Sequence, residues 1–147
     1  MSLILDACIE YNENRKVCVA SQLGKTYTLN NVSNYKIRKV RVDNCLLQKE
    51  GERRCDYLMN VDHDETPRAI FIELKGGALT DAVKQLYATI IYLKKEFSSC
   101  RIDARIVGTR DSPDIINSPH YRKLAREVEL TNGTIKRATN KALTENI

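Results

Sequence analysis

Hydrophobic residues dominate the segment 68–77, which predicts a buried strand that ends at Gly76 and Gly77. Side chains alternate along a strand, so Glu73 and Lys75 project side by side on one face. Charged groups in the middle of an apolar strand are costly unless they are paired or bound to an ion. The pattern therefore indicates either a structural ion pair or a catalytic one.

Two earlier segments also alternate between apolar and polar residues. They cover residues 35–47, with a kink expected at Asp43-Asn44, and residues 53–61. Polar turns at 48–52 and 62–67 separate the segments, and acidic residues 62–65 are read as turn residues rather than a metal cluster. Together with the strand at 68–77, they predict three antiparallel strands joined by hairpins.

Apolar residues recur every three or four positions in three other segments, which predicts helices over residues 3–13, 78–97 and 119–130. Ser118 is the expected N-cap of the last helix, with a proline in its first turn. Residues 101–108 alternate as a fourth strand. Because a helix precedes this strand, it can lie parallel to a strand of the same sheet.

Two parts of the chain keep alternatives open. Residues 17–20 fit either a short strand or a helical turn, and the tail from Ile135 either forms a last strand or frays. The order of elements predicts an α/β fold with a mixed central sheet flanked by helices. We expect one domain over residues 1–147, with a core at 3–108 and a C-terminal helix and basic tail at 109–147.

The composition, with 42% hydrophobic and 29% charged residues, is that of a folded soluble protein. No apolar run has the length of a transmembrane helix, and the first residues lack the pattern of a signal peptide. We therefore expect a cytoplasmic protein without a membrane partner.

The five cysteines are scattered singly, without a C-x-x-C spacing. Their odd number and spacing argue against a disulfide framework and against a zinc ribbon. We expect them to be small buried hydrophobic residues. They are Cys8, Cys18, Cys45, Cys55 and Cys100.

The net charge of +5 permits a polyanionic partner without requiring one. Basic residues form two groups, each of which fits either phosphate contacts or an ordinary solvated surface. The first consists of Lys36, Arg38, Lys39 and Arg41, and the second of Arg122, Lys123, Arg126, Lys136, Arg137 and Lys141.

A second acidic residue, Asp56, lies in the strand that precedes Glu73. If these strands pair about the turn at 62–67, Asp56 comes opposite Glu73 on the same face. Two opposed carboxylates repel unless a cation or a proton lies between them. Mg²⁺ takes oxygen ligands and keeps several waters, and a metal-bound water is a better nucleophile. Lys75 could orient that water or balance the charge on a phosphate.

Asp56, the Glu73-Leu74-Lys75 motif and the order of elements resemble the PD-(D/E)XK nuclease superfamily, with its restriction-endonuclease-like α-β-β-β-α-β core. The match covers about residues 3–108. The resemblance implies that Asp56 and Glu73 ligate Mg²⁺ (or Mn²⁺), that the Leu74 carbonyl supplies a further ligand, and that Lys75 assists the attacking water.

The resemblance also implies a ligand from the first helix and a polar residue on the helix after the motif. Glu10 is the candidate ligand, with Glu13 second, and Gln85 is the polar residue. Cys55 stands where the motif has proline, and Thr89 stands where an exonuclease-type Q-x-x-x-Y signature has tyrosine. These departures question the exonuclease branch but not the fold.

The leading hypothesis is a Mg²⁺-dependent nuclease that hydrolyses phosphodiester bonds in DNA. The alternative is an inactive nucleic-acid-binding or protein-interaction module with the same fold. Because a chain of 147 residues has little material for reading bases, we expect selectivity for DNA structure, or guidance by a partner. A homodimer is compatible with this size.

Overall fold

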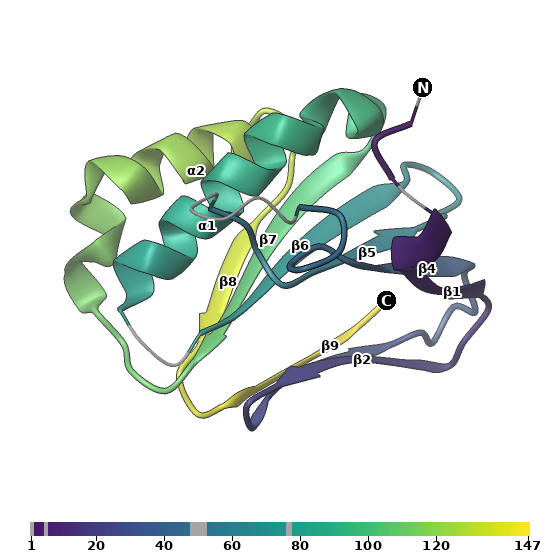
Figure 1. The fold of residues 1–147 in the computed structure, drawn as a ribbon, viewed down its shortest axis with the longest axis horizontal. Coiled ribbons are helices and arrows are strands. Elements are labelled where there is room, and N and C mark those ends of the chain that lie inside the picture. The colour runs from purple at the N-terminus through teal and green to yellow at the C-terminus, as the bar shows by residue number, and fades with distance from the viewer. Residues whose placement is uncertain (1, 5, 48–52, 76–77) are drawn as a thin grey trace.

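The computed structural model describes residues 2–4, 6–47, 53–75 and 78–147, and describes only the backbone of Lys75. These residues form three layers (Figure 1). Two helices cover one face of a six-stranded sheet, and a three-stranded sheet covers the other face. The fold is therefore mixed α/β, as expected, but the second sheet has no counterpart in the prediction.

The six-stranded sheet is mixed. Its first four strands are antiparallel to their neighbours, and its last three are parallel to each other. In spatial order the strands are β1 (Ile9–Glu13), β4 (Ile37–Arg41), β5 (Tyr57–Val61), β6 (Arg68–Lys75), β7 (Arg101–Gly108) and β8 (Ile135–Ala138). The predicted meander of three strands, followed by a parallel fourth, is confirmed as β4, β5, β6 and β7.

The three-stranded sheet joins distant parts of the chain. A hairpin of β2 (Val17–Gln22) and β3 (Lys25–Asn30) pairs with the C-terminal strand β9 (Ala142–Asn146), which runs parallel to β3. Leu23 and Gly24 form the hairpin turn with φ of 49° and 79°, the positive values that suit the twist of two-residue hairpins. The strand alternative is thus the right one both for residues 17–20 and for the tail.

The two helices match their predicted positions. Helix α1 (Leu79–Leu93) continues into a 3-10 helix (Lys94–Phe97), and α2 (Pro119–Glu129) follows β7 and a short 3-10 helix (Pro113–Asn117). The Ser118 hydroxyl accepts the backbone N–H of Tyr121 at 3.1 Å, which confirms the predicted N-cap. Among the described residues, no helix is long and apolar enough to cross a membrane.

Two hydrophobic cores lie on the two sides of the six-stranded sheet, and β6 supplies both. Phe71 packs against the helices, whereas Ile70, Ile72 and Leu74 pack against the three-stranded sheet. All four side chains are buried. By the same alternation Glu73 lies on the helical side.

A buried ion pair connects the two sheets. Arg105 of β7 is 1% exposed, and its Nε donates to Oε1 of Glu145 in β9 at 2.5 Å. Tyr27 of β3 donates its hydroxyl to the same oxygen at 2.8 Å. Burial alone would raise the pKa of Glu145, but the hydrogen bond and charge of Arg105 lower it to about 2. The two sheets are therefore held together by polar as well as apolar contacts.

The predicted helix over residues 3–13 is wrong. Only Asp6–Cys8 form a single 3-10 turn, and Ile9–Glu13 form the edge strand β1, which pairs with β4. Within β1, Ile9 and Tyr11 are the two partly buried residues, a period of two that fits a strand. Residues 9–13 form a strand because they pair with the edge of β4, although the apolar spacing of residues 3–13 also fits a helix.

The strand boundaries also differ from the prediction. Residues 35–47 contain only the short strand β4, and the expected kink is present, with Asn44 at a φ of 59°. The strand predicted over 53–61 begins at Tyr57. The expected turn at 48–52 lies outside the described residues.

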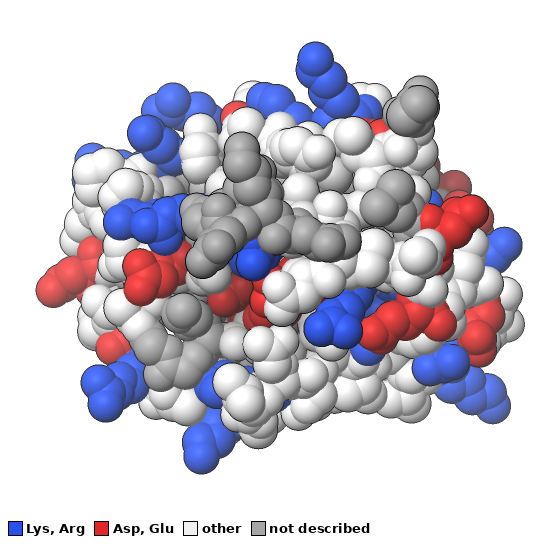
Figure 2. Space-filling view, viewed as in Figure 1, with Lys and Arg blue, Asp and Glu red and all other residues white. Residues whose placement is uncertain are grey.

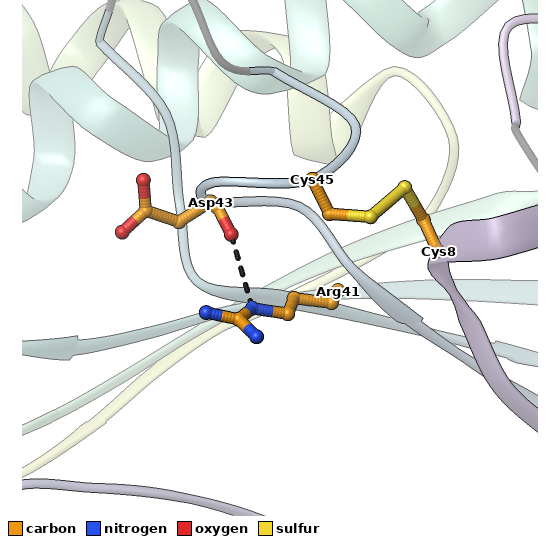
Figure 3. Close-up of a disulfide and its surroundings, with 4 residues drawn as sticks. All are labelled: Cys8, Arg41, Asp43 and Cys45. Carbon is orange, nitrogen blue, oxygen red and sulfur yellow. Dashed lines mark hydrogen bonds between the residues drawn. A yellow bond between two sulfur atoms is a disulfide. The ribbon is translucent and has the colours of Figure 1, made fainter.

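Cys8 and Cys45 form a disulfide, which corrects the expectation that all five cysteines are single thiols (Figure 3). The bond joins the segment before β1 to the loop after β4, and their separation of 37 residues gave no recognisable spacing. In the same loop, Arg41 Nε donates to the carbonyl oxygen of Asp43 at 3.3 Å. Disulfides persist mainly in oxidising surroundings, so this bond does not favour the cytoplasm. Cys18 and Cys55 are free and buried, as expected.

Candidate functional site

The register between β5 and β6 brings the two predicted carboxylates together. Tyr57 pairs with Ile72 and Val61 with Arg68, which is the predicted register. Asp56 directly precedes this ladder, and its backbone N–H donates to the Ile72 carbonyl at 3.1 Å. Asp56 therefore enters the sheet beside the end of β6 that carries Glu73.

The carboxylate of Asp56 is fixed to the backbone of β6. Its Oδ2 accepts the N–H of Leu74 at 2.8 Å, and the residue is 6% exposed. This hydrogen bond takes the place of a further rung of the ladder and holds the carboxylate next to the Glu73-Leu74 peptide. A buried carboxylate that accepts a backbone N–H is well positioned for a defined role.

Glu73 is 2% exposed and lies under helix α1. With the Gln85 amide oriented to satisfy its hydrogen bonds, Nε2 donates to Glu73 Oε2 at 3.0 Å and to the Asp81 carbonyl at 3.1 Å. The structure thus brings Gln85 to the predicted site. It lies one helical turn before Thr89, on the face of α1 that meets the sheet.

Thr89, which departs from the tyrosine of the exonuclease signature, has a positioning role that the sequence did not reveal. Its buried Oγ1 accepts the backbone N–H of Cys55 at 2.8 Å and donates to the Gln85 carbonyl at 2.9 Å. One hydroxyl therefore links the residue before Asp56 to the helix that carries Gln85. A polar residue in the buried stripe of a helix was the available signal.

The buried thiol of Cys55 directly precedes Asp56, and its Sγ donates to the Tyr57 carbonyl at 3.6 Å. Burial raises the pKa of Cys55 well above its ordinary value, and the negative charges of Glu73 and Asp56 raise it further. Cys55 is therefore a neutral thiol and no candidate nucleophile.

Glu10 does not join this region. It lies on β1, where its carboxylate forms an ion pair with Lys39 Nζ at 2.8 Å. Lys39 also lies 4.7 Å from the centre of the Tyr57 ring, on the side of the sheet that faces the three-stranded sheet. Glu13 pairs instead with the exposed Arg15 at 3.4 Å. The missing first helix explains why neither residue reaches Glu73.

Lys75 is the last residue of β6, and its backbone is paired with Gly108 of β7. Its side chain and the following Gly76 and Gly77 lie outside the described residues. Leu74, the third predicted metal ligand, binds Asp56 through its N–H.

Asp56 also lines a cavity of about 300 Å³ at the end of β4 and β5. The cavity reaches the end of β2 in the β2–β3 hairpin. Near the middle of the face shown in Figure 2, acidic and basic atoms lie close together. The cavity is lined by Ser21, Gln22, Arg41, Asp43, Asn44, Asp56 and Tyr57. Solvent-sized molecules can therefore approach Asp56, the residue just before β5.

The donor set suits a hard divalent cation better than zinc. Within the described parts of the chain, no group of three or more His, Cys, Asp or Glu residues is placed to hold a metal. Mg²⁺ needs only one or two carboxylates because waters and substrate phosphates complete its six oxygen ligands. Asp56 and Glu73 could supply those two carboxylates.

The members of the basic cluster at residues 36–41 make different contacts. Lys39 pairs with Glu10, and Arg38 Nη2 donates to the side chain of Asn60 at 3.2 Å. The acidic run at 62–65 is a turn, as expected, in which His63 packs on Tyr35 with ring centres 4.6 Å apart.

The protein is thus a mixed α/β protein with two buried carboxylates, one just before strand β5 and one near the end of its antiparallel neighbour β6. In comparisons with known proteins, the chain matches no family model, no curated protein and no solved structure.

Proposed function

We propose that this protein is a metal-dependent nuclease that hydrolyses phosphodiester bonds in DNA. The observation that carries the proposal is the pairing of β5 with β6, which places the buried carboxylates of Asp56 and Glu73 at the end of one strand pair. Burying two acidic groups together costs free energy unless a cation compensates their charge. Mg²⁺ bound beside the two carboxylates would supply such a charge.

The roles follow from the contacts of each residue. Asp56, held by the N–H of Leu74, and Glu73, held by Gln85, would ligate Mg²⁺. Bound Mg²⁺ lowers the pKa of its water and neutralises charge on the phosphate. Gln85 would keep the Glu73 carboxylate oriented, and Lys75 would assist the attacking water.

The proposal includes membership of the PD-(D/E)XK superfamily. The order of three antiparallel strands, helix α1 and a parallel strand supports it. The absence of a helix at residues 3–13 limits the likeness to the part of the chain from β4 onward. The metal site would accordingly lack a ligand from a first helix.

The test is cleavage of plasmid and linear DNA by the purified protein in Mg²⁺ or Mn²⁺, with an RNA substrate in parallel. Glu73→Gln and Lys75→Ala should each lower the cleavage rate about 100-fold or more, the scale of losing a group that acts at the reacting centre. Asp56→Asn retains an oxygen for the Leu74 N–H and tests the charge alone.

The matched control is Glu13→Gln, which removes a carboxylate from an exposed pair with Arg15. It should cut DNA at the wild-type rate, and circular dichroism should show that all variants are folded. Equal cleavage by wild type and Glu73→Gln would sink the proposal. Metal-independent DNA binding without cleavage by wild type would favour the inactive binding module instead.

A further inference from the structure

A groove between α1 and α2 forms a second cavity, of about 360 Å³. Its volume lies in the range of small-ligand pockets. Two residues come from α2, three come from α1, and one comes from the segment before β5. The lining consists of Arg53, Lys84, Tyr87, Ala88, His120 and Lys123.

The groove adjoins the candidate active site. Lys84 directly precedes Gln85, whose amide binds Glu73. Arg53 Nη1 lies 3.9 Å from the side chain of Asp81, and the carbonyl of the same Asp81 accepts from Gln85. The groove and the candidate active site therefore share helix α1, and the Arg53–Asp81 contact lies at the end of that helix that carries the Gln85–Glu73 hydrogen bond.

The charges of the groove suit a polyanion. None of its lining residues is acidic, and three of them are Lys or Arg. Within the part of the chain that the structure describes, no ion pair involves Lys84 or Lys123. Arg53 has only the long contact to Asp81, in which both side chains are about half exposed. Basic side chains also follow the helical layer at the upper left of Figure 2.

The groove also has an aromatic surface. Tyr87 is partly exposed and lies beside Ala88, so that a flat ring and a small side chain are flanked by cations. Proteins that hold single-stranded nucleic acids combine these two features, because bases stack on aromatic rings while lysines and arginines follow the phosphates. Duplex DNA hides its bases in the stack and offers no base to Tyr87.

We propose that this groove binds a single-stranded stretch of DNA beside the bond that is cut. The proposal rests on the proposed nuclease function and names its substrate class: DNA with an unpaired strand next to the cleavage point. A base lies on Tyr87, and the neighbouring phosphates contact Lys84 and Lys123. Arg53 directs the strand towards Asp56 and Glu73.

The first test measures binding without cleavage, by fluorescence anisotropy of a labelled short oligothymidine in EDTA over a series of salt concentrations. Each phosphate contact contributes about 0.7 to the slope of log affinity against log salt for single strands. The double variant Lys84→Ala/Lys123→Ala should therefore lower the slope by about 1.4. Tyr87→Leu should weaken binding about tenfold, the scale of one lost stacking contact, while Tyr87→Phe should bind as wild type.

The matched control is Lys16→Ala/Lys95→Ala, which removes the same charge from exposed positions outside the groove. It should leave the slope unchanged. An equal loss in both double variants, or equally tight binding of a duplex of the same length, overturns the proposal. Groove-dependent binding without cleavage by the wild type would reject the nuclease function but keep the groove as a strand-binding site. If Tyr87→Leu cleaves DNA at the wild-type rate, the groove is rejected as a strand-binding site and the nuclease function is kept.

Discussion

The Thr89 hydroxyl accepts the backbone N–H of Cys55 at 2.8 Å, across 34 residues of sequence. It also donates to the carbonyl of Gln85. One buried side chain therefore fixes the distance between the residue before Asp56 and the helix whose glutamine holds Glu73. Thr89 therefore helps to position both carboxylates, although its two hydrogen bonds go to Cys55 and Gln85.

Thr89→Val should lower the free energy of unfolding by about 1–3 kcal/mol, because the buried N–H of Cys55 loses its acceptor. The nuclease rate should fall further than the loss of folded protein explains, because Asp56 follows Cys55 directly. Urea denaturation and cleavage assays on the same preparation check both effects. Thr89→Ser keeps the hydroxyl and should retain most of the activity; an equal loss in both variants would contradict this role.

Breaking the Cys8–Cys45 disulfide should destabilise the protein by about 4 kcal/mol, since the bond closes a loop of 37 residues. The loop after β4 also contains Asp43, which pairs with Arg54 just before Cys55. Denaturation with and without dithiothreitol, and of Cys8→Ser, measures the effect. Cys100→Ser is the control, because Cys100 is a free thiol and should not change the stability by a similar amount.

The Glu145 carboxylate should make folding sensitive to acid. Its pKa falls from the ordinary 4.5 to about 2 in the folded protein, where Arg105 and Lys136 bind it. A lowered folded-state pKa stabilises the protein above pH 4.5, and this contribution is lost as the pH falls towards 2. The fall of the pKa from 4.5 to about 2 corresponds to a loss on the order of 3 kcal/mol.

Glu145→Gln should flatten the acid limb of the stability curve and lower the stability at neutral pH, because the buried Arg105 loses its close partner and keeps only the longer ion pair with Asp103 at 3.8 Å. Thermal melts between pH 2 and pH 7 would measure both effects. Glu13→Gln, in an exposed pair, should leave the curve unchanged. An unchanged acid limb in Glu145→Gln would show that other carboxylates dominate the transition.

Gly133→Ala should be strongly destabilising. A Cβ atom at this position would lie 1.7 Å from the carbonyl oxygen of Ile102, so the backbone of β7 or the turn before β8 must move. Gly24→Ala is the informative comparison, because its Cβ meets nothing within 4 Å and it suffers only from the positive φ of 79°. That cost is about 1–2 kcal/mol, and chemical denaturation should show a clearly larger loss for Gly133→Ala.

Local patterns in the sequence sufficed to predict the part of the fold that positions the site. The spacing of the turn at 62–67 set the register that places Asp56 next to β6, and the 3.6-residue period predicted helix α1, which carries Gln85. Both inferences concern neighbours in sequence or one helix turn. They need no knowledge of distant partners.

Distant partners decided what the sequence left open or suggested wrongly. The segment at 3–13 has apolar residues that fit a helix, but the free edge of β4 makes it a strand and directs Glu10 to Lys39. The hairpin β2–β3 gains its third strand only from β9, which lies at the other end of the chain. The disulfide likewise depends on spatial proximity that single cysteines do not indicate.

The pairing of β3 with β9 has a consequence for folding kinetics. It joins Thr26 to Ala142, whereas β4, β5 and β6 pair with their neighbours along the chain. Closing long loops costs entropy that local hairpins do not pay, so the local strands should form first and β9 should dock late. Interactions that form after the transition state control how fast a protein unfolds rather than how fast it folds. Substitutions in β9 should accordingly shorten the lifetime of the native state while leaving the rate of its formation almost unchanged.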